Sequence, residues 1–262
     1  MLKNRLIPKL QMRRSAHDRN GRMVLVTTVG FDTSVEIGDP VSQAKIYEAQ
    51  AADELVFLDL DASHENRSTT VAVVRKAAEE IFMPFTVGGG VRTLADFRDL
   101  LSNGADKVSI NTAAVETPSL ITEASDAFGA QCVVLSIDYR RTRDGGARVW
   151  TRSGTADTGL DAIEWAREGE RRGAGEILLT SIDRDGSRAG IDLEVTRRVA
   201  ESVSVPVIAG GGCGLARHFI EAFLVGKADA VSAGTYFCFK DENPMQTRAQ
   251  IRNAGVPIRM HT

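Results

Sequence analysis

The sequence has few cysteines and no long apolar runs, and both absences limit the classes of protein to which it can belong. Only 3 of its 262 residues are cysteines, at Cys132, Cys213 and Cys238, too few and too scattered for a disulfide framework. We expect free thiols, buried where Cys132 and Cys238 fall in apolar runs. No apolar run approaches the ~18 residues of a membrane span, and no signal peptide is evident. The sequence therefore predicts a cytoplasmic protein with no membrane partner.

A basic surface is missing as well. The chain has 32 Lys and Arg against 35 Asp and Glu, a net charge of −3, which leaves no footprint for nucleic acid. Its 4 histidines show no metal-ligand spacing. We therefore expect no nucleic acid, no metal and no cofactor.

Short β-rich runs alternate with helical patterns along the whole chain. The expected strands are Leu6–Met12, Glu54–Leu60, Phe85–Val87, Lys107–Ile110, Cys132–Asp138, Glu176–Ser181, Val207–Ala209 and Ala230–Ala233. The expected helices are Val41–Gln50, Thr69–Ile81, Leu94–Ser102, Pro118–Phe128, Leu160–Arg171, Leu193–Ser202, Ala216–Leu224 and Met245–Asn253. This alternation predicts an α/β fold, a single (β/α)₈ TIM barrel. A doubly wound open sheet is the alternative, but the first strand lacks the G-x-G-x-x-G turn of that fold.

An internal repeat favours the barrel. Pro84 recurs as Pro206 and Glu54 recurs as Glu176, each 122 residues later. Matches at one period and in one order predict two (β/α)₄ half-barrels, about 1–128 and 129–262, within one domain.

Two connections are longer than loops usually are. Residues 13–38 exceed the usual ceiling of ~12 residues for a structureless loop, so we expect a lid or a local hairpin. Tyr139–Thr158 contains a turn followed by Arg148-Val149-Trp150-Thr151, which predicts a small hairpin. Both follow strands at their carboxyl ends, on the face where barrel active sites lie.

The chain is organised around two glycine-rich turns, Val87-Gly88-Gly89-Gly90-Val91-Arg92 and Ile208-Ala209-Gly210-Gly211-Gly212-Cys213-Gly214. Each follows a strand and precedes a helix. There, backbone N–H groups and the helix dipole favour an anion. A purely steric turn is the alternative for either one alone, but the pair predicts two phosphate cradles, completed by Asn111-Thr112 and Gly234-Thr235.

Polar residues end several of the other strands. Asp138 ends an apolar strand and is a candidate general acid/base, or else a cap bonded to backbone. Asp183-Arg184-Asp185-Gly186 is a second candidate, or else a turn with a helix cap, and Asp59 and Asp61 either order loops or contact substrate. The expected phosphate and substrate contacts are Gly89, Gly90, Asn111, Thr112, Asp185, Gly186, Gly211, Gly212, Gly234, Thr235, Thr180 and Asp59.

Long motifs resemble the cyclase subunit of imidazole glycerol phosphate synthase, a histidine-pathway barrel. They are Asp53-Glu54-Leu55-Val56-Phe57-Leu58-Asp59, Thr86-Val87-Gly88-Gly89-Gly90, Gly104-Ala105-Asp106-Lys107-Val108-Ser109-Ile110-Asn111-Thr112 and Gly175-Glu176-Ile177-Leu178-Leu179-Thr180-Ser181-Ile182-Asp183-Arg184-Asp185-Gly186. The resemblance extends nearly from end to end.

The resemblance implies a glutaminase partner, forming a heterodimer at the N-terminal face of the barrel and delivering ammonia to a bis-phosphate on the other face. It also implies an ammonia gate made of Arg5, Glu54, Lys107 and Glu176, with Asp106 contacting the glutaminase. A salt-bridge ring that only stabilises the barrel is the alternative.

The catalytic end departs from the family pattern. The family uses an Asp on strand one and an Asp on strand five, and here these positions are Gln11 and Asp138. A neutral amide cannot exchange a proton at working pH. The loop lysine of the family falls on Thr27, and a serine before the second glycine turn falls on Gly210.

Three functions follow from this pattern. The first is an ammonia-conducting paralogue that supports a separate amidotransferase in the amidination of a bacterial surface sugar. The second is a working cyclase/lyase, making imidazole glycerol phosphate and the aminoimidazole carboxamide ribotide, in which His17, Asp18 or Asp32 covers for Gln11. The third is a phosphate-binding scaffold that only activates the glutaminase.

Overall fold

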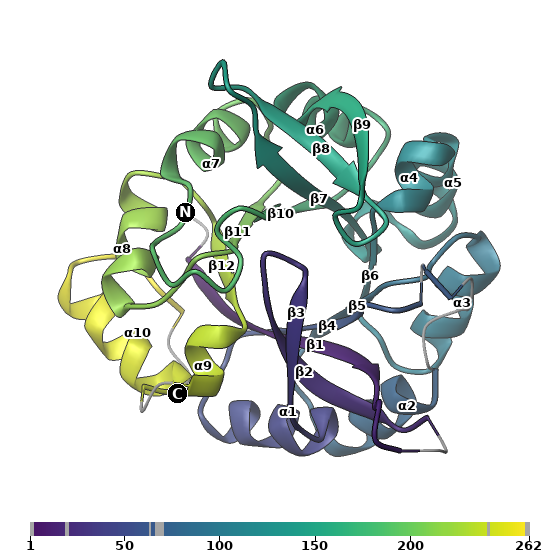
Figure 1. The fold of residues 1–262 in the computed structure, drawn as a ribbon, viewed down its shortest axis with the longest axis horizontal. Coiled ribbons are helices and arrows are strands. Elements are labelled where there is room, and N and C mark those ends of the chain that lie inside the picture. The colour runs from purple at the N-terminus through teal and green to yellow at the C-terminus, as the bar shows by residue number, and fades with distance from the viewer. Residues whose placement is uncertain (1–2, 19–20, 63, 66–70, 240–241, 260–262) are drawn as a thin grey trace.

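A closed barrel of parallel strands forms the centre of the molecule (Figure 1). The computed structural model describes residues 3–18, 21–62, 64–65, 71–239 and 242–259. Within them, the barrel strands in order are β1 (Arg5–Arg14), β4 (Leu55–Asp59), β5 (Phe85–Gly88), β6 (Lys107–Ile110), β7 (Val133–Arg141), β10 (Glu176–Ser181), β11 (Val207–Gly210) and β12 (Ala230–Ala233). Pairing of β12 with β1 closes the ring. The predicted (β/α)₈ barrel is confirmed.

Helices surround the strands on the outside (Figure 1). They are α1 (Pro40–Ala49), α2 (Val71–Glu80), α3 (Leu94–Ser102), α5 (Ser119–Phe128), α6 (Ala162–Arg171), α7 (Leu193–Ala200), α8 (Ala216–Leu224) and α10 (Pro244–Asn253). Their starts follow local chemistry, because the Asp39 side chain caps α1 and Thr93 forms a capping box with Asp96 at α3. The expected start of the second helix at Thr69 lies outside the described residues.

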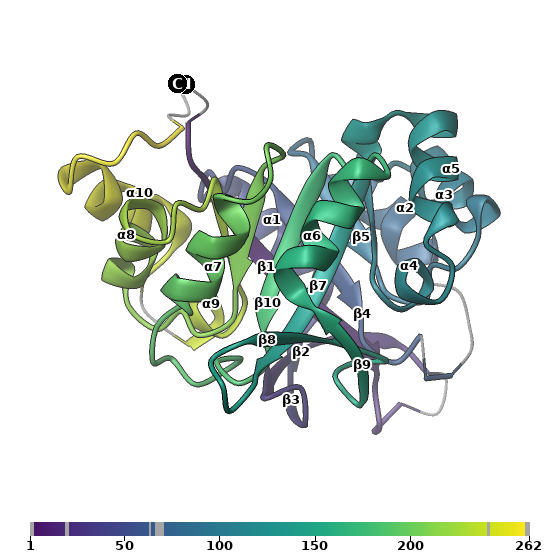
Figure 2. The ribbon, with the colours of Figure 1, turned by 90° about the horizontal axis from the view of Figure 1, so that it is seen from above.

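Both long connections fold into hairpins above the barrel. The first is β2 (Met23–Val29) with β3 (Thr33–Gly38), and the second is β8 (Ala147–Thr151) with β9 (Ala156–Asp161). They project from the same end of the barrel (Figure 2). The sixth helix starts at Ala162 rather than Leu160, because Leu160 belongs to β9.

The sequence pattern does not predict two short helices and one turn of 3₁₀ helix. These elements are α4 (Thr112–Glu116), α9 (Thr235–Phe239) and η1 (Ala130–Cys132). Each is too short to show a helical period. Cys213 is buried, but Cys132 in η1 and Cys238 in α9 are only partly buried, so the expected burial of these two thiols is wrong. In the part of the chain described here, no helix has the length and apolar character to cross a membrane.

The side chains inside the barrel form layers. A small apolar cluster fills its middle, formed by Ile7, Val56, Val134, Leu178, Ile208 and Ala230. The larger apolar core lies between the strands and the helices. Because successive side chains of a strand point to opposite faces, Arg5, Lys9 and Gln11 share the inward face of β1 with Ile7. The interior therefore holds charged groups below the apolar layer and polar groups above it.

In the first glycine turn, position 89 tolerates only glycine, whose φ here is +94°. A Cβ at this position would lie 2.1 Å from the Asp59 carbonyl oxygen, whereas a Cβ at Gly145, with φ of +84°, would meet nothing within 4 Å. Gly89→Ala should therefore lower the free energy of unfolding by about 3 kcal/mol or more, and Gly145→Ala by about 1–2 kcal/mol. Urea denaturation of both variants measures the difference. Equal losses would mean that backbone strain alone, without the clash, sets the cost.

Candidate functional site at the barrel mouth

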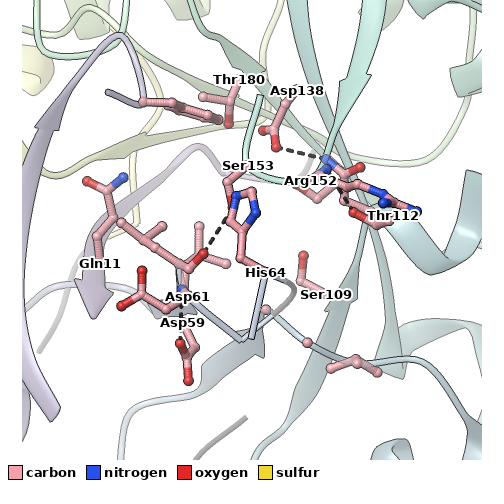
Figure 3. A pocket seen from close by; sticks show the side chains of 18 of the residues that line it. Gln11, Asp59, Asp61, His64, Ser109, Thr112, Asp138, Arg152, Ser153 and Thr180 are labelled. Atoms are coloured by element: carbon pink, nitrogen blue, oxygen red, sulfur yellow. Dashed lines mark hydrogen bonds between the residues drawn. The ribbon is translucent and has the colours of Figure 1, made fainter. Parts of the chain in front are cut away.

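A cavity of about 380 Å³ opens where the carboxyl ends of the strands meet (Figure 3). This volume lies within the usual range of small-molecule sites. Of the residues singled out from the sequence, it is lined by Gln11, Asp59, Gly89, Gly90, Asn111, Thr112, Asp138 and Thr180. The first glycine turn and both acid/base positions therefore meet in one cavity.

The second glycine turn borders a much smaller space. A cavity of about 10 Å³ is lined by Asp185, Gly186, Gly211, Gly212, Gly234 and Thr235, together with Lys9 and Gln11. That volume is about enough for one water molecule. The residues expected to form two phosphate cradles thus lie around two cavities of unequal size.

The first hairpin contacts the loop after β10, which borders this second cavity. The hydroxyl of Thr28 donates to Asp185 Oδ2 at 2.6 Å, and the N–H of Gly30 donates to the Asp185 carbonyl at 3.0 Å. A Cβ on Gly186 would lie 2.3 Å from the Thr28 carbonyl oxygen, so the hairpin rests directly on this loop.

The second hairpin borders the first glycine turn. The N–H of Arg152 donates to the Thr112 hydroxyl at 3.0 Å, which leaves the hydroxyl proton of Thr112 to donate elsewhere. The Ser153 hydroxyl donates to the carbonyl of Leu60 at 3.0 Å. Arg152 and Ser153 both line the large cavity. Sequence analysis missed them, although they follow the expected hairpin strand 148–151 directly.

Asp138 has the properties of an acid/base group. Its Oδ2 accepts a hydrogen bond from Asn111 Nδ2 at 2.8 Å, and among the described residues no backbone group donates to it. Burial raises the pKa of Asp138 to about 7, although the charge of Lys9 and the Asn111 hydrogen bond oppose the rise. A carboxyl that titrates near neutral pH can both take up and release a proton.

Gln11 is held in a hydrogen-bonded network. It is buried, and its Nε2 donates to the Thr28 hydroxyl at 3.0 Å, which in turn donates to Asp185. This network joins β1, the first hairpin and the loop after β10. Of the groups considered as substitutes for an acid at this position, Asp32 lines the large cavity, whereas His17 and Asp18 do not.

Lys9 is the ionisable group that sequence analysis overlooked. Its side chain is 4% exposed, it lines both cavities, and its Nζ lies 3.9 Å from Asp185 Oδ1. Period-two alternation on the first strand would have revealed it, since Arg5, Ile7 and Gln11 share its face.

Asp59 and Asp61, at the end of β4 and just after it, fix the conformation of the loop at the barrel mouth. Asp59 Oδ1 accepts hydrogen bonds from the backbone of Asp61 and Ala62, at 3.3 and 3.2 Å. Asp61 pairs with Arg13 at 2.8 Å and so ties the end of β1 to this loop. Both carboxylates also line the large cavity. For the segment Asp183-Arg184-Asp185-Gly186, one alternative is a turn with a helix cap. The cap is wrong for both aspartates, because the side chain of Asp192 caps α7.

At the opposite end of the barrel, four charges form a closed ring. Arg5 contacts Glu54 at 2.6 Å and Glu176 at 2.5 Å, and Lys107 contacts the same two carboxylates at 3.1 and 2.8 Å. Burial alone would raise the pKa of Glu54, but the charges of Arg5 and Lys107 hold it below its ordinary value. The residues expected to form a gate are therefore in mutual contact.

Asp106 lies beside this ring and is exposed. Its carboxylate accepts a hydrogen bond from the N–H of Phe85 at 2.9 Å. Asp229 does the same for the N–H of Val207, also at 2.9 Å, in the other half of the repeat. Asp106 thus orders the start of β5, whatever it contacts outside the chain.

Together, the fold and the mouth define a (β/α)₈ barrel with a polar ligand cavity at the carboxyl ends of its strands. The family profile described as "Histidine biosynthesis protein" matches residues 6–242. A protein of Prochlorococcus marinus (strain MIT 9313), named "Putative imidazole glycerol phosphate synthase subunit hisF2", is 47% identical over 260 residues, 99% of each chain. The "Imidazole glycerol phosphate synthase subunit HisF" of Clostridium botulinum (strain Okra / Type B1) is 46% identical over 261 residues, 99% of this chain and 100% of the relative. The chain belongs to this family of cyclase-type subunits.

The titration of Asp138 should appear in the stability of the protein. The unfolded carboxyl loses its proton near pH 3.8 and the folded one near pH 7, so folding is progressively disfavoured between these values and the penalty is constant above pH 7. Asp138→Asn, which stays neutral, should gain roughly 2–4 kcal/mol of unfolding free energy relative to wild type between pH 4 and pH 7.

Urea denaturation at pH 4.5, 6 and 8 measures this gain. Asp157→Asn is the matched control, because a hydrogen bond from the Gly159 N–H lowers the pKa of the exposed Asp157 carboxyl and the pH trend should run the other way. A difference for Asp138→Asn that does not change with pH would contradict the assignment.

Proposed function

We propose that this chain is the ammonia-accepting subunit of a glutamine amidotransferase complex, with a glutaminase docked beside Arg5, Lys107 and Asp106. We further propose that it serves a separate sugar amidotransferase in the amidination of a bacterial surface sugar. Two kinds of support exist: the relatives are named as synthase subunits, and the gate residues are all present and in contact.

The single observation that carries the sugar proposal is Gln11. In the resembling family this position holds one of two acid/base carboxylates. Here it holds a buried amide, whose Nε2 donates to Thr28 and which has no proton to exchange. The gate end is thus intact while half of the acid/base pair is lost, as expected of a subunit that delivers ammonia to chemistry performed elsewhere.

The interior above the gate suits the passage of a neutral molecule. The ring of alternating charges leads into the apolar layer around Ile7 and Leu178. Ammonium would lose its hydration there without gaining an anionic partner, whereas ammonia is uncharged. A path through this layer would therefore carry ammonia and reject ammonium.

A second candidate function is the cyclase reaction itself, and Asp138 favours it. Its carboxyl retains a pKa of about 7 beside a cavity of about 380 Å³. Lys9, and Asp32 at the cavity wall, are the ionisable groups placed to compensate for Gln11.

The two functions differ in turnover. The chain with its glutaminase should convert the phosphoribulosyl bis-phosphate of the histidine pathway about 10²–10⁴-fold more slowly than a subunit with both carboxylates, because one positioned acid or base is worth that factor. A coupled assay for imidazole glycerol phosphate measures it, with Gln11→Asp as the matched variant. Ordinary enzyme rates in wild type, or growth of a cyclase-deficient histidine auxotroph carrying this chain, would establish the cyclase instead.

The gate is tested by Lys107→Met. Removing one cation leaves Glu54 and Glu176 sharing Arg5, which should distort the ring and reduce transfer of nitrogen from glutamine by about tenfold or more, if the ring is worth one charged hydrogen bond. Transfer from added ammonium salts should stay unchanged. Lys45→Met is the control, since Lys45 forms an exposed ion pair with Glu80 on the outer helices.

The measurement follows ¹⁵N from amide-labelled glutamine into product, in the complex with glutaminase and sugar amidotransferase. Unchanged labelling in Lys107→Met, with glutaminase activation intact, would favour the scaffold function over the conduit.

A further inference from the structure

The ammonium of Lys9 is buried without a hydrogen-bond acceptor. Its side chain is 4% exposed, and its nearest carboxylate oxygen, Asp185 Oδ1, is 3.9 Å away, beyond hydrogen-bonding distance. Across the described ranges, Nζ donates no hydrogen bond. A buried charge without hydrogen bonds is costly, so a protein that keeps one in a cavity wall has a partner that enters from the cavity.

The polar neighbours of Lys9 are mostly bonded to other groups, and Asp185 Oδ1 stays 3.9 Å from its Nζ. The oxygen Oδ2 of Asp185 already accepts the Thr28 hydroxyl, and Asp138 is bonded to Asn111. Gln11, next on the same face of β1, donates to Thr28. The three N–H donors of the ammonium are therefore available only to atoms inside the cavities.

The position of Lys9 indicates what those atoms belong to. Lys9 lines both the large and the small cavity and so stands where they adjoin. In Figure 3, Gln11, two residues along the same strand, lies across the large cavity from Thr112 and Arg152. Lys9 and the first glycine turn, at Gly89 and Gly90, line the same cavity, so one small molecule could contact both.

We propose that Lys9 is a ligand-binding residue, whose ammonium donates a hydrogen bond to an anionic oxygen at one end of a small phosphorylated molecule. The phosphate at the other end of that molecule lies on the first glycine turn. The proposal deepens the proposed function, since it rests on the mouth binding a ligand, but it does not depend on ammonia transfer.

Calorimetry on the full chain tests this with two probes, ribulose 1,5-bisphosphate and ribulose 5-phosphate. Wild type should bind the bisphosphate more tightly. Lys9→Met should weaken bisphosphate binding about 10–100-fold, the usual worth of a hydrogen bond to a charged group, and change monophosphate binding less than about threefold. Lys9→Arg, which keeps the charge but changes its donor geometry, should lose about three- to tenfold.

Lys45→Met is the matched control and should bind both probes as wild type does. Equal weakening of both probes in Lys9→Met, or no weakening in the folded variant, would assign Lys9 a structural role and overturn the proposal. If Lys9→Met does not fold, Lys9→Arg decides, and unchanged bisphosphate affinity in that variant overturns the proposal.

Failure of wild type to bind either probe also overturns the proposal. That failure would leave the ammonia conduit standing, because transfer through the gate is measured separately with labelled glutamine. Loss of transfer in an otherwise ligand-binding protein would do the reverse.

Discussion

Closure of the barrel by the pairing of β12 with β1 is the constraint on which the rest of the structure depends. Once the ring is closed, every second residue of each barrel strand must point into the interior of the barrel. On β1 this places Arg5, Ile7, Lys9 and Gln11 in one column, from the charged ring through the apolar layer to the mouth. A single strand thus connects the two functional ends.

The charged side chains at the two ends of this column differ in how far other groups of the chain neutralise them. At the bottom, each carboxylate of Glu54 and Glu176 contacts both Arg5 and Lys107, so the ring is complete within the chain. At the mouth, Lys9 has only a distant carboxylate, and Asp138 titrates near neutral pH. A buried pair is stable only when its remaining hydrogen bonds are satisfied. The charges at the lower end are therefore satisfied within the chain, whereas Lys9 at the mouth donates no hydrogen bond among the described residues.

Much of this could be read from the sequence, because alternation, repeat and turn chemistry are local signals. The strands 107–110, 176–181 and 230–233 and the helices 94–102 and 216–224 have the expected bounds. The short helix α4 and the exposure of Cys132 could not, since neither leaves a period in the sequence. Lys9 was readable from alternation, but its lack of a hydrogen-bond partner depends on distances that only the folded chain sets.

The two glycine turns of the repeat border cavities of unequal size, about 380 and about 10 Å³. Both turns follow a strand in the same way, but only the second adjoins the loop to which Thr28 fastens the first hairpin, through Asp185. Gln11 strengthens that contact because its amide donates to Thr28, whereas a carboxylate there would face Asp185 with the same charge. Gln11 therefore helps to hold the first hairpin against the loop after β10, because it supports the hydroxyl through which Thr28 binds Asp185.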